Sequence, residues 1–280
     1  MTEPRNVLIV GLGLMGGSLA KALKRDPARG VTISAFTAEP AAAERARRDG
    51  TIDRALDDPR TAFPSADVIV YATPVAATLD LLEAHAPLLR TCRAAVTDVC
   101  SVKLAVVTRA RGLGLDRFVG GHPLCGGERS GYDAARADLY DGACVYLVGA
   151  GDPAADETVA ATWRSAGADV EPIDAGLHDE RMAWVSHLPQ VLASGLASTL
   201  AREHVAPEQL GPGGRDMVRL AASSPALWVE ILRANRHHVA PALRAFTAEL
   251  HHFEAALAAG DEHALHDLLS RARGWRMERP

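Results

Sequence analysis

A glycine-rich turn near the start of the chain has the residue types and spacing that bind a dinucleotide phosphate. The segment Gly11-Leu12-Gly13-Leu14-Met15-Gly16 follows an apolar run, Asn6–Val10, and precedes a helical stretch. The first glycine permits a tight turn, the second lets a pyrophosphate approach the backbone, and the third lets helix and strand pack closely. A turn that only connects strand and helix is the alternative. The context favours a nucleotide site that includes Leu14 and Met15.

The residue that selects between the two nicotinamide dinucleotides is expected just after the second strand, roughly 20 residues beyond the turn. An acid there would bind the ribose of NAD, whereas an arginine nearby would accommodate the phosphate of NADP. Thr37 occupies this place and is neutral, and Ala38 follows it. The sequence therefore predicts NAD or NADP as the cofactor without choosing between them.

A serine and a histidine that follow two later strands could take part in proton transfer. Ser101 follows the predicted strand Ala94–Thr97, and His122 follows Arg117–Val119. Ligands of an open α/β sheet bind at the carboxyl ends of its strands, so both side chains should face the reactive end of the cofactor. Histidine is a suitable proton acceptor for hydride transfer, and a nearby serine can fix its ring by a hydrogen bond. Taken alone, His122 could also be a core histidine.

The elements that position these residues alternate between strand and helix. Further strands are predicted at Val31–Phe36, Val68–Ala72 and Cys144–Val148, and helices at Ser18–Arg25, Glu39–Asp49, Ala76–Leu88 and Lys103–Ala110. This order predicts an α/β domain, a dinucleotide-binding parallel sheet with helices on both faces.

After about Asp174 the pattern becomes helical. Apolar residues recur at helical spacing over His178–Glu203, where Pro189 should introduce a kink. A later stripe begins at Leu243, and Gly260 can end that helix while Asp261 caps the next. We expect a sheet domain over residues 1–174 and an all-helical domain over residues 175–280, packed together because the join is short.

Composition excludes several classes of protein. The chain has 280 residues, 48% of them hydrophobic, and a net charge of −5. These values argue against a disordered chain and against a general nucleic-acid or anionic-membrane binder. No apolar run approaches the roughly 18 residues that a membrane span needs, and no signal peptide is recognised. Four irregularly spaced cysteines suit a reducing cytoplasm. Histidines spread along the later helices indicate a solvated face, so no metal is expected.

Six segments, in this order along nearly the whole chain, resemble the prephenate dehydrogenase family, which includes arogenate and cyclohexadienyl dehydrogenases. They are GLGLMGGSLA from Gly11, YATPV from Tyr71, TDVCSVK from Thr97, GHPLCGGERSG from Gly121, HDERMAWVSHLP from His178 and RLAASSPALW from Arg219. The resemblance implies NAD(P)-dependent oxidative decarboxylation of prephenate or arogenate to 4-hydroxyphenylpyruvate or tyrosine, in tyrosine biosynthesis. It also implies a homodimer formed through the helical domain.

The resemblance assigns a role to each residue of these segments. His122 would accept the proton of the ring C4 hydroxyl, Ser101 would orient His122, and Arg219 would bind a substrate carboxylate, which suits its planar fork of donors. The other implied substrate contacts are Ser186, Gln190, Gly127 and, near the pocket entrance, Glu128 and Asp179. The residues implied to line the cofactor are Gly11, Gly13, Gly16, Thr73 and Pro74.

Two departures from the family pattern keep other readings open. Gly127 stands where a hydroxyl residue is common, and Gln190 stands where many prephenate-using members have histidine. Gln190 is neutral and could face a keto or an amino group without a charge penalty. The same chemistry on a modified substrate, such as 4-amino-4-deoxyprephenate in a secondary pathway, is one alternative. A non-catalytic NAD(P)-binding redox sensor is another, although the intact Ser101, His122 and Arg219 argue against it.

Overall fold

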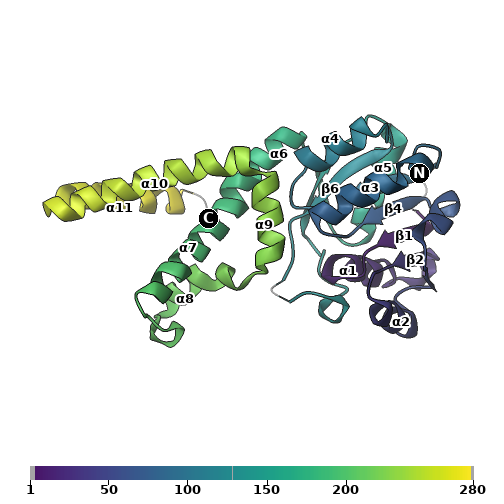
Figure 1. Ribbon diagram of the computed structural model, residues 1–280, viewed down its shortest axis with the longest axis horizontal. Helices are drawn as coiled ribbons and strands as arrows, with labels where there is room; N and C mark the ends of the chain where they lie inside the picture. The colour runs from purple at the N-terminus through teal and green to yellow at the C-terminus, as the bar shows by residue number, and fades with distance from the viewer. Residues whose placement is uncertain (1–3, 128, 279–280) are drawn as a thin grey trace.

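Eight strands between Asn6 and Pro172 form a single sheet in the computed structural model, which describes residues 4–127 and 129–278 (Figure 1). The strand order is β3-β2-β1-β4-β5-β6-β7-β8, and every neighbouring pair is parallel except β6 and β7. The strands are β1 (Asn6–Val10), β2 (Thr32–Phe36), β3 (Arg54–Ala55), β4 (Val68–Tyr71), β5 (Ala95–Asp98), β6 (Phe118–Pro123), β7 (Cys144–Val148) and β8 (Asp169–Pro172). The predicted α/β class with a mostly parallel sheet is confirmed.

Alternate residues of the strands face two separate layers of helices. Val7 and Ile9 of β1 pack on one side of the sheet with α1, α2 and α5, whereas Leu8 and Val10 pack on the other side with α3 and α4. These helices are α1 (Leu14–Leu23), α2 (Pro40–Arg48), α3 (Val75–Leu89), α4 (Leu104–Gly112) and α5 (Pro153–Ser165). Because both faces are covered, the central strands β1 and β4 are almost wholly apolar, which is why their sequences form continuous hydrophobic runs.

The elements from Ala175 onward are helical. They are α6 (Ala175–Met182), a π-helical segment (Ala183–His187), α7 (Leu188–Arg202), α8 (Pro212–Val218), α9 (Pro225–Ala234), α10 (Arg236–Ala259) and α11 (Glu262–Met277). Helices α6 and α9 lie beside the sheet region, while α7 leads away from it to α8 (Figure 1). Short 3-10 turns occupy Pro27–Arg29, Pro59–Ser65, Tyr132–Ala134, Pro207–Gln209 and Arg219–Ala222.

The irregularity in the helix that contains Pro189 precedes the proline. Proline has no N–H to bond the carbonyl four residues earlier, which here is that of Val185. Val185 lies in the π-helical segment, whose wider turn accommodates the missing hydrogen bond. The expected break is therefore present, as a π segment that leads into α7. The predicted end at Gly260 and cap at Asp261 also hold, with Gly260 at φ 64° and the Asp261 carboxylate accepting the Ala264 N–H.

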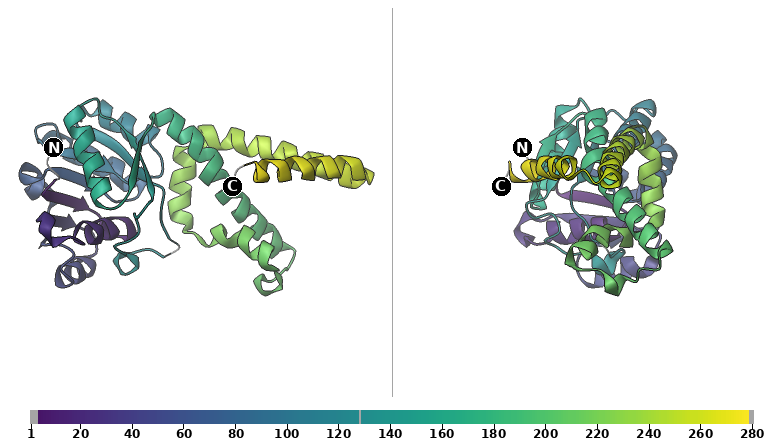
Figure 2. Two further views of the ribbon diagram at one scale, coloured as in Figure 1. Left: turned by 180° about the vertical axis from the view of Figure 1, so that it is seen from behind. Right: turned by 90° about the vertical axis from the view of Figure 1, so that its left-hand side faces the viewer.

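Helices α10 and α11 form a long arm that projects away from the rest of the molecule (Figure 2). The arm carries large apolar side chains that are more than half exposed, including Leu257, Leu269 and Trp275. None of the helices in the described part of the chain is long and apolar enough to cross a membrane. These side chains give the arm an apolar surface that no other described part of the chain covers.

Candidate active site

The glycine turn has the shape that a dinucleotide pyrophosphate needs. Gly11 has φ +108°, and a Cβ there would lie 2.5 Å from the carbonyl oxygen of Ala72. A Cβ on Gly16 would lie 1.9 Å from the Gly11 carbonyl oxygen, so helix and strand meet only because both residues are glycines. A Cβ on Gly13 would meet nothing within 4 Å. This open space lies at the N-terminus of α1, where the first amides have no helical acceptor, and it fits the pyrophosphate of NAD or NADP.

The segment after β6 lies over this turn. A Cβ on Gly127 would be 3.7 Å from Leu14 Cδ2, and the Tyr140 hydroxyl donates to the Met15 carbonyl over 2.8 Å. Gly127, expected to contact substrate, thus lies against the start of α1. The neighbouring residue Glu128, also expected at the substrate pocket, lies outside the described residues.

The side chain expected to choose between NAD and NADP makes a local contact. The Thr37 hydroxyl accepts the N–H of Glu39 over 3.2 Å. Two arginines of α2 are paired elsewhere, Arg45 with an aspartate 3.0 Å away and Arg47 with a glutamate 3.0 Å away. The end of β2 therefore carries a neutral hydroxyl residue next to two arginines that already have carboxylate partners.

Two further strand ends bring predicted residues to the same edge of the sheet. Pro74 is the cap residue of α3, directly after β4. The Thr73 carbonyl accepts a weak hydrogen bond from the thiol of Cys100, with 3.8 Å between oxygen and sulfur. Ser101, half-buried, follows Cys100 after β5. The sheet thus assembles the cofactor-lining and serine positions beside the glycine turn, since β1, β4 and β5 are parallel neighbours.

His122 lies near the end of β6 and is 8% exposed. Its Nδ1 is 2.8 Å from Nε2 of His178, whose ring stands edge-on to it. Burial, reinforced by the neighbouring His178 and Lys103, holds the pKa of His122 well below its usual value. A hydrogen bond from Ser101 to His122 is not found in residues 4–127 and 129–278. The contact that orients His122 among the described residues therefore comes from His178, for which the sequence analysis predicted no role.

A buried ion pair holds the strand that carries His122. Lys103 and Asp98 are both fully buried and paired with each other. The ammonium of Lys103 also donates to the Gly121 carbonyl over 2.6 Å, and Asp98 accepts the Gly121 N–H over 3.0 Å. Sequence reasoning missed this pair. Its only signal was an acid and a lysine five residues apart around a strand end.

Asp179 is buried, with 2% exposure, and does not line a pocket entrance as expected. Its Oδ1 is 2.7 Å from Nδ1 of His178, and its two oxygens accept the N–H groups of Lys103 and Leu104 over 2.7 and 3.0 Å. Burial alone would raise the pKa of Asp179, but these hydrogen bonds bring it below its usual value. The carboxylate therefore caps α4 and binds His178, which explains its position in the interior.

Asn235 connects this cluster to the helical region. Its amide donates to the Asp179 carbonyl over 2.7 Å and lies 3.0 Å from Nδ1 of His187. His187 is fully buried, and burial lowers its pKa to about 4. The two regions thus meet at a run of buried histidines and amides.

The residues predicted to bind the side chain of the substrate lie in the helical region. Gln190 is 4% exposed, and its Nε2 donates to the Leu220 carbonyl over 2.9 Å. Its Oε1 has no partner among the described residues. Exposed Arg219 immediately precedes Leu220, and half-buried Ser186 lies in the π segment one turn before Gln190. The structure therefore brings Arg219, Gln190 and Ser186 into one neighbourhood.

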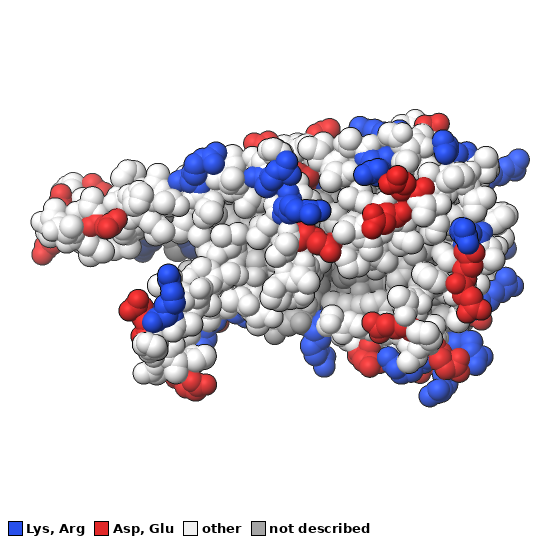
Figure 3. Space-filling model, viewed as in Figure 1, with Lys and Arg blue, Asp and Glu red and all other residues white. Residues whose placement is uncertain are grey.

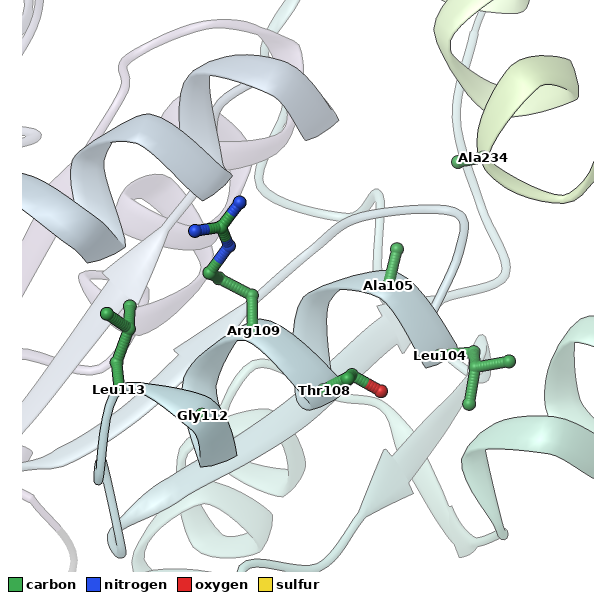
Figure 4. A pocket seen from close by; sticks show the side chains of 7 residues that line it. All are labelled: Leu104, Ala105, Thr108, Arg109, Gly112, Leu113 and Ala234. Carbon is green, nitrogen blue, oxygen red and sulfur yellow. The ribbon is translucent and has the colours of Figure 1, made fainter.

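A surface pocket of about 610 Å³ lies along α4 and the end of α9 (Figure 4). It is lined by Leu104, Ala105, Thr108, Arg109, Gly112, Leu113 and Ala234. None of these is a predicted site residue. The described part of the chain also holds no group of three or more metal-binding side chains.

Comparison with known proteins matches both regions to models of a single family. Residues 19–171 match the nucleotide-binding domain of prephenate dehydrogenase, and residues 174–271 match its dimerization domain.

Individual relatives agree over nearly the full length. A cyclohexadienyl dehydrogenase of Zymomonas mobilis is 34% identical over 269 residues, covering 93% of this chain and 91% of that protein. The crystal structure of prephenate dehydrogenase from Aquifex aeolicus with hydroxyphenyl propionate and NAD+ is 32% identical, with a TM-score of 0.88, covering 99% of this chain and 98% of that one. Synechocystis arogenate dehydrogenase is 27% identical, with a TM-score of 0.82, covering 98% of this chain and 100% of that one.

Proposed function

The chain belongs to the prephenate dehydrogenase family of NAD(P)-dependent oxidoreductases, and we propose that His122 is the base of its oxidative decarboxylation. The single observation that carries this proposal is the position of His122. It is a nearly buried histidine near the end of β6, and Nδ1 is engaged by His178. The low pKa that burial imposes keeps the ring neutral at pH 7, as a proton acceptor must be.

The reaction joins proton removal to loss of a carboxylate. His122 takes the proton of the C4 hydroxyl of prephenate or arogenate as that carbon is oxidised. The bound nicotinamide supplies the hydride acceptor. The bond from the ring to its carboxylate breaks, CO2 leaves, and the electron pair enters the ring, which becomes aromatic. The glycine turn, with Leu14, Met15, Thr37, Thr73 and Pro74, would hold the cofactor, and Ser101 would contact the hydroxyl.

The helical region would bind the rest of the substrate. Arg219 suits a carboxylate, which both prephenate and arogenate present on the side chain. Ser186 and Gln190 lie close to it in the fold. We expect Arg219→Ala to raise KM more than it lowers kcat, because the carboxylate contact is made in the ground state as well as in the transition state. A loss confined to kcat would contradict this role.

We also propose a homodimer, with the division between the regions near residues 174 and 175. The match of residues 174–271 to a dimerization domain and the exposed apolar side chains of the arm support it. Charges of both signs are interspersed over the face of the molecule in Figure 3. The four cysteines are free thiols, which is consistent with a cytoplasmic location.

The test is an assay of the purified full chain with each substrate and each cofactor. Prephenate and arogenate are combined with NAD and with NADP, and the reduced nicotinamide is followed by its absorbance. CO2 release at one equivalent per hydride is the expected result for at least one pair. Binding of NAD or NADP without oxidation of either substrate would contradict the proposal and favour a cofactor-binding sensor.

A further inference from the structure

We propose that His178 and Asp179 are positioning residues that fix the tautomer of His122, so that Nε2 of His122 is the atom that accepts the substrate proton. This inference rests on the proposed function of His122 and adds the means by which its reactive nitrogen is chosen. It assigns a role to two buried side chains that do not touch the substrate.

The three side chains form one continuous hydrogen-bonded series. Nδ1 of His122 is 2.8 Å from Nε2 of His178, and Nδ1 of His178 is 2.7 Å from Oδ1 of Asp179. His178 is 0% exposed and Asp179 is 2% exposed. Water therefore does not compete for either contact, and each nitrogen must use the partner that the fold provides.

The carboxylate of Asp179 determines which nitrogen donates in each hydrogen bond of the series. Asp179 accepts backbone N–H groups of Lys103 and Leu104 in addition to the contact with His178. An ionised carboxylate only accepts hydrogen bonds, so His178 must donate through Nδ1. The other nitrogen of a neutral His178 is then an acceptor, and His122 must donate to it through Nδ1. The lone pair of His122 is left on Nε2.

Both rings are neutral at pH 7. Burial lowers the pKa of His178 despite the opposing effect of Asp179, and burial lowers that of His122 further. The protons of the two rings therefore lie on Nδ1 of His178 and on Nδ1 of His122. Nε2 of His122 is thus free to accept a proton before substrate binds.

The buried carboxylates act on His178 rather than directly on His122. Asp179 and Asp98 raise the pKa of His178 against the effect of burial, whereas Lys103 lowers the pKa of both rings. A proton that reaches the pair is therefore stabilised mainly at its Asp179 end. The titratable and charged groups packed around the His122–His178 pair are Asp98, Lys103, Tyr146, Asp179 and His187.

The direct test reads the tautomer by NMR of the full chain labelled with [15N]histidine, without cofactor. His122→Asn identifies the resonances of His122. We expect Nδ1 of His122 to carry the proton and Nε2 to be proton-free at pH 7. A proton on Nε2 in the unaltered protein would overturn the proposal, whatever the enzyme assay shows.

A matched pair of variants tests the consequence. His178→Leu leaves a buried Nδ1–H without an acceptor, so the proton should move to Nε2 and kcat should fall by about 10- to 100-fold. His178→Gln can place its carbonyl oxygen near the former Nε2, and it should keep the tautomer and most of kcat. The same tautomer and the same kcat in both variants would overturn the proposal.

A third variant separates positioning from folding. Asp179→Asn removes the carboxylate that raises the pKa of His178, so protonation of the His122–His178 pair should need a lower pH and the acid limb of kcat/KM should move to lower pH. A purely structural role would change the amount of folded enzyme but leave that limb in place, and an unmoved limb would count against the proposal. Failure of the unaltered enzyme to oxidise either substrate would instead refute the proposed function, while the NMR measurement would still decide the tautomer.

Discussion

The sheet region and the helical region bury their apolar side chains in different ways. In the sheet region, strand residues such as Ile9, Ile33 and Val70 are 0% exposed, because helices of the same chain cover both faces. In the arm, Leu257 is 65% and Trp275 is 79% exposed. The apolar core of the sheet region is therefore covered by its own helices, whereas the helical region leaves exposed apolar side chains that the proposed dimer would cover.

This difference bears on how the site is built. The proposed base and the cofactor turn belong to the sheet region, where Lys103 and Asp98 hold the end of β6 by hydrogen bonds to Gly121. The residues proposed to bind substrate belong to the helical region, which carries the proposed dimer contact. We therefore expect changes in the arm to affect substrate binding and oligomeric state, and changes in the sheet to affect cofactor binding and folding.

The largest effect should come from breaking the proposed dimer. Leu257→Glu places a charge on the exposed stripe of α10. Burying one leucine stabilises a complex by about 1.5–3 kcal/mol, and each substitution occurs twice in a symmetric dimer, so self-association should weaken by about 3–6 kcal/mol. Analytical ultracentrifugation over a range of concentrations measures the change.

His251→Glu is the control, because His251 is already polar and exposed on the same helix. It should leave the association constant close to that of the unaltered protein unless the residue lies inside the contact. A Leu257→Glu variant that associates as strongly as the original, or an unaltered chain that is monomeric at micromolar concentration, would contradict the homodimer.

The next effect concerns pH at the junction of the two regions. His122, His178 and His187 all have a lowered pKa, because burial disfavours their charged forms. As the pH falls below 6.5, the unfolded chain binds protons that the folded chain does not, so the free energy of unfolding falls. For His187, with its pKa at about 4, the loss between pH 6.5 and 4 should be about 3 kcal/mol.

Urea unfolding at pH 7 and at pH 4.5 measures this loss. His187→Gln removes one of the titrating groups and should reduce the difference between the two pH values. An unchanged difference in that variant would show that His187 is protonated equally in both states, contrary to its burial.

The smallest effect should separate two functions of the glycine turn within the sheet region: close packing at Gly16 and cofactor binding at Gly13. Gly16→Ala places a Cβ 1.9 Å from the Gly11 carbonyl oxygen, and such overpacking should lower the free energy of unfolding by about 1–3 kcal/mol. Gly13→Ala meets no atom within 4 Å and should leave stability nearly unchanged while weakening cofactor binding, because the space is where the pyrophosphate approaches. Thermal unfolding and calorimetric titration with NAD distinguish the two. Equal effects of both variants on stability would contradict this division.

The parts of the fold that could be predicted from sequence are those that bury continuous apolar runs. Strand β1 and strand β7 were located at their observed bounds, because a strand covered on both faces is apolar at every position. Strands β3 and β8 were missed. Both lie at the edges of the sheet, most of their residues are exposed, and the sequences Arg-Ala and Asp-Val-Glu-Pro carry no hydrophobic period.

In the candidate site, too, the sequence predicted only those residues that a local pattern identifies. The glycine turn and His122 could be recognised because short motifs in a predicted strand and loop context define them. The contacts of His178 and Asp179 could not, because their partners lie 56 and 76 residues away along the chain and no local pattern reports them. Asp179 was expected at the pocket entrance because the family resemblance implied a role there. Only the fold shows the amides and the histidine that compensate its burial.

The measurement that tests the central claim most directly is the turnover of His122→Asn in the full chain. Asparagine is polar and smaller, so the fold and the affinity for the cofactor should be retained, which circular dichroism and titration with NAD can verify. The account predicts that kcat falls by roughly 10²–10⁴, the usual contribution of one positioned base. Turnover within a few-fold of the unaltered enzyme would contradict the assignment of His122 and, with it, the catalytic role given to the end of β6.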